Sequence, residues 1–85
     1  MKVLIPSALR SYTESSHATA SGATLAELLV DLDRQYPGIR FRMIDEQHKV
    51  RRHIRIFING AQEMDLARAL QSSDEVVIVQ ALSGG

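Results

Sequence analysis

Hydrophobic residues recur along the chain at the spacings of one amphipathic helix and several short strands. The clearest element is a helix over residues 24–36, whose apolar side chains follow the i, i+3, i+4, i+7, i+11 spacing of one helical face: Leu25, Leu28, Leu29, Leu32 and Tyr36. Thr24 and Glu27 form a capping box at its start, and Pro37-Gly38 ends it. The pattern predicts a helix whose leucine face is buried.

Three segments have the short β-branched patterns of strands, at 2–6, 54–58 and 75–80, and a weaker strand is predicted at 17–21. In 54–58 the three isoleucines occupy alternate positions, so they share one face of the strand. Asn59-Gly60 follows at once. This dipeptide favours a tight hairpin turn because both residues tolerate positive φ.

The remaining segments are predicted to connect these elements. Residues 39–52 are polar and charged and are expected to form a long connection, and a short helical turn is expected at 66–70. The connection contains a basic run at Lys49, Arg51 and Arg52. We expect this run to be either a solvated loop or a docking patch for an acidic protein partner. Nucleic acid is disfavoured because no aromatic residue alternates with these basic residues for stacking.

The order strand, strand, helix, strand, short strand or turn, strand predicts an α+β fold. One main helix on one face of a mixed sheet of four or five strands is the economical architecture. The first and last strands would pair in parallel at its centre, which is the β-grasp, or ubiquitin-like, arrangement. Eighty-five residues suffice for one domain. We expect the domain to span residues 1–80 and a flexible tail, 81–85, to end in Gly-Gly.

Composition excludes several classes of function. Ten Lys+Arg and ten Asp+Glu give a formal net charge of zero, which disfavours a general polyanion binder. The chain has no cysteine, so it has neither a disulfide framework nor a cysteine nucleophile. It also lacks a Gly-x-Ser-x-Gly motif, a phosphate-binding glycine loop, a membrane-spanning apolar run and a signal-peptide pattern. We therefore expect a cytoplasmic protein without catalytic residues of its own and without nucleic-acid or membrane partners.

Metal binding is also disfavoured. His48 and His53 are five residues apart, a spacing that places them on opposite faces of a strand, and His17 is remote in sequence. No cysteine or helical His-x-x-x-His pair supports them. The adjacent carboxylates Asp45 and Glu46 are expected to lie on a solvated loop rather than to act as an acid and a base.

The tail carries the most specific signal, because Gly84-Gly85 directly follows the last predicted strand. Five extended residues, 81–85, reach about 16–18 Å. Glycine lacks a Cβ, so the last backbone units fit a narrow channel in another enzyme. The terminal carboxylate of Gly85 becomes electrophilic once its oxygen is part of a good leaving group, for instance an acyl-adenylate. The chain is therefore expected to be the substrate and carrier, and its partner the catalyst.

The sequence resembles the ThiS/MoaD family of ubiquitin-like sulfur carriers over nearly its whole length. The matching segments are Val3-Leu4-Ile5-Pro6, Ala8-Leu9-Arg10, Gly22-x-Thr24-Leu25, Tyr36-Pro37-Gly38-Ile39, Asn59-Gly60, Asp74-Glu75-Val76 and Gly84-Gly85. The resemblance implies that an activating enzyme adenylates the terminal glycine with ATP, and that sulfur then replaces AMP. It implies that Gly85 bears a thiocarboxylate, that Gly84 gives it clearance, that the chain binds no cofactor, and that a sulfur-acceptor synthase is a further partner.

The segment Ile5-Pro6-x-x-Leu9-Arg10 and the basic connection ending in Arg52-His53 resemble CysO-type carriers, which serve cysteine synthesis. A CysO-like or unassigned MoaD-like carrier is favoured over the small subunit of molybdopterin synthase, whose first strand tends to be rich in aromatic residues. ThiS proteins rank last because they are usually shorter through the middle. Two alternatives stay open: a ubiquitin-like modifier conjugated through Gly85 to lysine, and a passive interaction module.

A docking surface for the activating enzyme is predicted on the sheet. If the isoleucines of 54–58 face the helix, Phe57 faces away from it, beside Val77 and Val79 of the last strand and Leu4 of the first. An exposed apolar patch beside a reactive tail is a candidate docking site. Leu82, in the tail, is assigned to the same partner-binding set. The alternative is that loops cover these residues.

Overall fold

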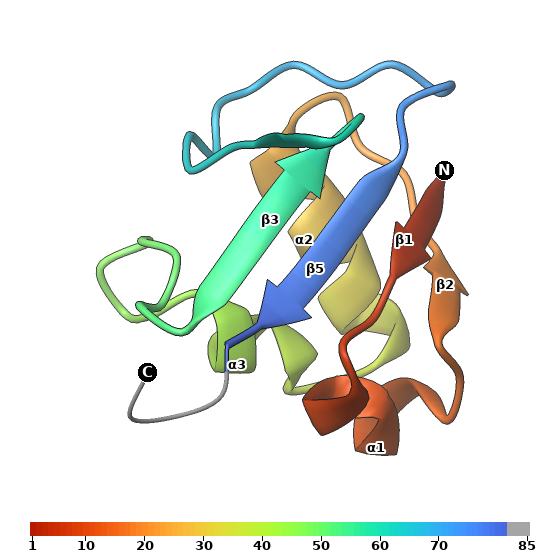
Figure 1. Cartoon of the computed structure of the whole chain (residues 1–85), viewed down its shortest axis with the longest axis vertical. Helices are drawn as coiled ribbons and strands as arrows, with labels where there is room; N and C mark the ends of the chain where they lie inside the picture. The colour runs from red at the N-terminus through yellow and green to blue at the C-terminus, as the bar shows by residue number, and fades with distance from the viewer. Residues whose placement is uncertain (82–85) are drawn as a thin grey trace.

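A computed structural model describes residues 1–81 of the chain, which form a mixed five-stranded sheet with strand order β2-β1-β5-β3-β4. The strands are β1 (Lys2–Leu4), β2 (His17–Thr19), β3 (Ile54–Ile58), β4 (Ala61–Gln62) and β5 (Val76–Gln80). The central strand β5 is parallel to β1 and antiparallel to β3 (Figure 1). Both edge strands pair antiparallel with their neighbours. The sheet has the predicted β-grasp topology, with the first and last strands paired in parallel.

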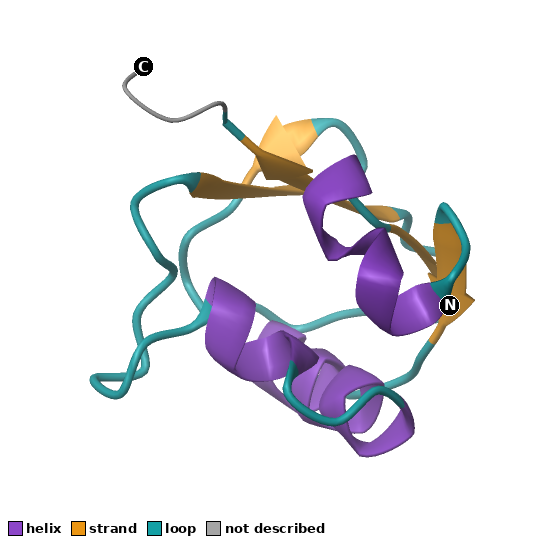
Figure 2. Cartoon of the chain, turned by 90° about the horizontal axis from the view of Figure 1, so that it is seen from below, coloured by secondary structure: helices purple, strands orange, loops and turns teal. Residues whose placement is uncertain are grey.

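The long helix α2 (Leu25–Gln35) covers one face of this sheet, and α3 (Ile39–Met43) lies on the same side (Figure 2). The four leucines of the predicted apolar face of α2 are fully buried. The Thr24 hydroxyl caps the helix by accepting from the Glu27 amide at 3.3 Å, as predicted. The Glu27 carboxylate accepts from the Ala23 amide rather than from the predicted Thr24 amide, so the capping box is displaced by one residue.

The prediction of an irregular connection over 39–52 was wrong for its first part, because α3 occupies 39–43. Ile39, Met43 and Ile44 are fully buried beneath the sheet, at a spacing that gives a single helical turn one apolar side. The start of this turn is stabilised from α2, where the Asp33 carboxylate accepts from the amides of Gly38 and Arg40 at 3.1 and 3.0 Å.

Short helical segments form after β1 but not at 66–70, where one was predicted. A 3₁₀ turn η1 (Ser7–Leu9) and a short helix α1 (Arg10–Thr13) follow β1. No helix forms at 66–70. The Arg68 amide closes a single turn on the Asp65 carbonyl. Beyond that turn, the Arg68 carbonyl accepts from the Leu25 amide and the Leu70 amide donates to the Ala23 carbonyl, so the backbone bonds to the start of α2.

Two glycines occupy positions that other residues would strain. A Cβ on Gly22 would collide with the backbone of Glu27 and Leu28 at the first turn of α2. Gly60 has φ +86°, and with Asn59 at φ 53° it forms the predicted hairpin turn between β3 and β4. The Asn59 side chain also bonds to Asp74 and to the Glu75 amide, which ties this turn to the start of β5.

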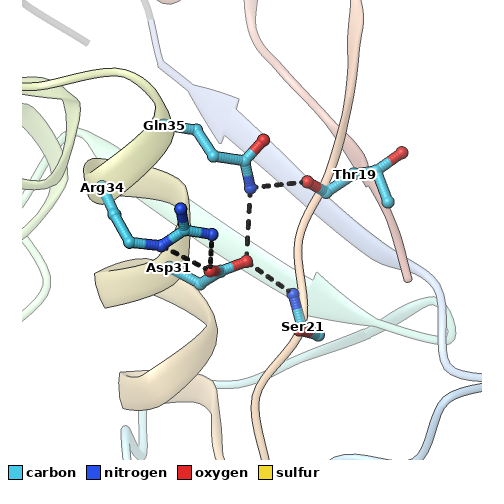
Figure 3. A network of polar contacts seen from close by, with 5 residues as sticks. All are labelled: Thr19, Ser21, Asp31, Arg34 and Gln35. Atoms are coloured by element: carbon cyan, nitrogen blue, oxygen red, sulfur yellow. Dashed lines mark hydrogen bonds and ion pairs between the residues drawn. The ribbon is translucent and has the colours of Figure 1, made fainter.

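A polar network joins α2 to the edge of the sheet beside β2 (Figure 3). The Asp31 carboxylate pairs with Arg34 at 2.6 Å and accepts from the Ser21 amide at 3.0 Å. Gln35 donates to the same carboxylate and to the Thr19 carbonyl. The Arg34 and Ser21 bonds hold the pKa of Asp31 below its usual value.

Candidate functional site

The sheet face turned away from α2 carries a row of side chains that crosses all five strands. The register of the ladders makes each member the cross-strand neighbour of the next, in the order His17, Leu4, Val77, Phe57 and Gln62. The three central members are apolar and half-buried. The row therefore places an apolar centre between two polar ends.

Alternation along the strands explains this arrangement. In β3 the residues on either side of Phe57, Ile56 and Ile58, are at most 1% exposed, and in β5 the neighbours of Val77 are buried in the same way. Val79 follows Val77 on the outer face and is 40% exposed. The structure thus brings Leu4, Phe57, Val77 and Val79 together as one surface, which we call the apolar row; its role as a partner contact stays a prediction.

The chain leaves the sheet at the end of β5. The Ala81 amide donates to the His53 carbonyl at 2.7 Å, which adds one bond beyond the pairing of Gln80 with Ile54. The direction of the backbone is therefore fixed as far as Ala81. The predicted tail residues Leu82, Gly84 and Gly85 lie outside the described residues.

A groove opens beside this exit, between η1 and α1 on one side and α3 on the other. Gln80 and His53 line it at the ends of β5 and β3, and Phe41, Arg42 and Arg51 line it from α3 and the loop before β3. Two of these residues were missed by the sequence reasoning. Phe41 and Arg42 lie in the segment predicted to be a connection, and only the turn of α3 directs them to the groove.

Both arginines of the groove are held in place by aromatic residues. Arg42 donates its Nε–H to the Tyr12 hydroxyl at 2.9 Å, a bond that raises the pKa of the guanidinium. Arg51 donates its Nε–H to the Phe41 carbonyl at 2.7 Å, and its guanidinium lies over the Phe41 ring, 4.6 Å from the centroid. Of this group, sequence reasoning singled out only Arg51.

The histidines and the acidic pair do not assemble into a reactive site. His17 lies on the edge strand β2, His48 follows Asp45 in an exposed loop, and His53 borders the groove. No three potential metal ligands cluster anywhere in residues 1–81. Asp45 accepts from the amides of Lys49 and Gln47, which lower its pKa and close this loop.

The described residues form two surfaces at the end of the sheet where β5 finishes. One is the apolar row on the outer face of the sheet, and the other is the groove lined by Arg42 and Arg51, which we call the basic groove. Within residues 1–81, no helix has the length and apolar character needed to cross a membrane.

Comparisons with known proteins agree on one family. The model of the ThiS family matches residues 3–85. The sulfur carrier protein CysO of Mycobacterium tuberculosis is 35% identical over 89 residues, which cover 98% of this chain and 96% of that protein.

Solved structures give the same fold. A chain in the crystal structure of the Amycolatopsis orientalis BexX/CysO complex superposes with a TM-score of 0.89 at 30% identity, covering 99% of this chain and 98% of that one. The solution structure of the small archaeal modifier protein 1 from Methanosarcina acetivorans gives 0.80 at 28% identity, covering 99% and 94%.

Proposed function

Because the chain belongs to the ThiS family, we propose that it is a sulfur carrier of the CysO type that transports sulfur as a thiocarboxylate on Gly85. It is a carrier rather than a catalyst, so the reactions on its tail are performed by partner proteins. The observation that carries this proposal is the position of β5. The strand is held on both sides by its neighbours, and its bonds fix the backbone as far as Ala81, shortly before the terminal Gly85.

Two steps load the carrier. In the first, an oxygen of the Gly85 carboxylate attacks the α-phosphorus of ATP in the partner enzyme, and pyrophosphate leaves. In the second, a hydrosulfide or an equivalent sulfur nucleophile attacks the acyl carbon and AMP leaves. The product is a thiocarboxylate, whose sulfur is then donated to an acceptor in biosynthesis. We assign the acceptor to cysteine synthesis, which the CysO type serves, and ATP to the partner as its co-substrate.

The apolar row is the proposed docking surface for the adenylating enzyme. Phe57 and Val77 are direct cross-strand neighbours at its centre, and Val79 continues it toward the exit of the chain. A partner that covers this row also meets the tail, since only one residue separates Val79 from the last bond of the sheet at Ala81. Leu82 is assigned to the same proposed contact. We propose the cytoplasm as the location, since the loading step consumes ATP.

The experiment is to isolate the protein from the organism that encodes it and to measure its intact mass. A sulfur carrier is recovered partly as the thiocarboxylate, heavier than the carboxylate by the difference between one sulfur and one oxygen. Deleting the gene for the adenylating enzyme should abolish that form. If the thiocarboxylate is absent from cells that express both proteins, the proposal is wrong.

A modifier is the second candidate, and the similarity to a small archaeal modifier protein favours it. A modifier uses the same adenylated Gly85 but ends in an isopeptide bond to lysine. The two functions separate by their products. Proteolysis of cell extract followed by mass spectrometry should yield no peptide with the tail joined to lysine if the chain is a carrier alone.

A further inference from the structure

The groove beside Ala81 lies where any enzyme that takes up the tail must make contact. Gln80 lines the groove and the Ala81 amide is bonded to His53, another lining residue. A channel that accommodates the residues after Ala81 therefore has its mouth against this groove. The chemistry of the groove indicates what that mouth must contain.

The groove lies in the most positively charged part of the chain. Residues 38–55 contain six basic and two acidic side chains, an excess of four positive charges. Since the whole chain is formally neutral, the rest of it carries an equal excess of negative charge. The charge is thus separated along the sequence, with the positive part at the tail exit.

The two arginines of the groove are already oriented, and they have no carboxylate partner among the described residues. The ion pairs formed within residues 1–81 are Arg34 with Asp31 and Arg68 with Glu63. Arg42 and Arg51 instead use their Nε–H groups on a hydroxyl and a carbonyl. The terminal guanidinium nitrogens are the part of each side chain that remains to bind a carboxylate end-on.

An apolar surface lies beside these charges. Phe41 is 57% exposed although Arg51 stacks on its ring. An exposed aromatic ring in the same groove as two oriented guanidinium groups suits a protein segment that offers carboxylates and an apolar side chain together. A free inorganic anion would use only the charges.

We propose that this groove docks an acidic segment at the mouth of the partner's tail channel, with carboxylates on Arg42 and Arg51 and an apolar side chain on Phe41. This inference rests on the proposed carrier function and names a second contact for the same partner, next to the apolar row. Both surfaces contribute to binding of the partner, the apolar row on the sheet and the basic groove beside the mouth of the channel.

The test uses the adenylating enzyme of the same organism, ATP and sulfide, with the rate of thiolation measured against carrier concentration. Arg42→Gln and Arg51→Gln should each raise KM about tenfold, the effect of losing one charge-assisted hydrogen bond. The rate at saturating carrier should be unchanged, because the tail is intact. Added salt should raise the KM of the parent more than that of a double variant that carries both substitutions.

The matched control is Arg34→Gln. It removes the same charge from an exposed arginine on α2, beside the β2 edge of the sheet (Figure 3). Its KM should equal that of the parent. Melting temperatures show whether each variant is folded, and because Arg42 and Arg51 make different internal contacts, one variant can test the groove if the other unfolds.

The outcomes separate this inference from the function on which it rests. If the parent is thiolated and both groove variants have the KM and salt response of Arg34→Gln, the acidic docking segment is excluded while the carrier function stands. If the parent itself is never thiolated, the carrier function fails, and the groove proposal fails with it.

Discussion

Replacing Phe57 with glutamate should weaken binding of the adenylating enzyme without unfolding the domain. Phe57 is the only aromatic member of the apolar row and lies between Val77 on β5 and Gln62 on β4. Its ring is half-buried and faces away from the core, whose residues on β3 are Ile54, Ile56 and Ile58.

The substitution should cost less in folding stability than in binding free energy. Losing the cross-strand contact with Val77 should cost about 0.2–1 kcal/mol of folding stability. That is a small part of the roughly 5–8 kcal/mol expected for so small a domain. At a docking surface, truncation of a central aromatic residue typically costs about 2 kcal/mol or more. That cost corresponds to a loss of affinity of about thirtyfold, and burying a carboxylate at the same place should add to it.

Binding to the adenylating enzyme is measured by calorimetry, and folding by the melting temperature of each variant. The matched control is Val30→Glu, which makes the same kind of change at a residue that is 57% exposed on α2, opposite the apolar row. The control should bind like the parent. If folded Phe57→Glu binds as tightly as Val30→Glu, the apolar row is not the docking surface.

Three further predictions concern the fold. Leu28→Ala and Leu29→Ala should each cost about 2–5 kcal/mol in urea unfolding, since both side chains are fully buried; a loss below about 1 kcal/mol at both would contradict the described core. Gly22→Ala should lower the melting temperature because its Cβ meets the backbone of α2, and an unchanged value would refute that contact. Asp31 has a pKa lowered from 3.8 by Arg34, so its contribution to stability is present above that value and is lost as the pH falls through the lower, folded-state pKa. In an acid titration of melting temperature, Asp31→Asn should therefore lose less than the parent, and an equal loss would contradict this role.

The elements predicted correctly are those whose pattern repeats within one segment. The leucines of α2 repeat on the same face over about two turns, and the isoleucines of β3 alternate over five residues, so local periodicity was sufficient. The short helix α3 was missed because its stability comes from outside it: Asp33 caps it from α2, and its apolar residues are buried by the sheet. The turn at 66–70 failed for the same reason, since its backbone bonds to α2.

The two candidate surfaces also differ in whether a pattern within one segment was sufficient to predict them. The apolar row was predictable because strand alternation decides which side each residue faces, and pairing of the first and last strands brings Leu4 beside Val77. The basic groove was not predictable from the sequence, because it is assembled from four separate segments. Its bond between Tyr12 and Arg42 joins residues thirty positions apart, and no spacing within either segment indicates the other.

Thiolation of a shortened chain tests the carrier function most directly. Deleting Gly85 withdraws the terminal carboxylate by about 3.3 Å, and a misplacement of about 1 Å can cost a hundredfold in rate. An added alanine after Gly85 should fail similarly, because it moves the carboxylate and introduces a Cβ. The parent and both variants are incubated with the adenylating enzyme, ATP and sulfide, and their intact masses are followed with time. The account predicts that the parent exchanges one oxygen for sulfur, while both variants stay unmodified and melt like the parent. Thiolation of the shortened chain at the parent's rate would contradict it.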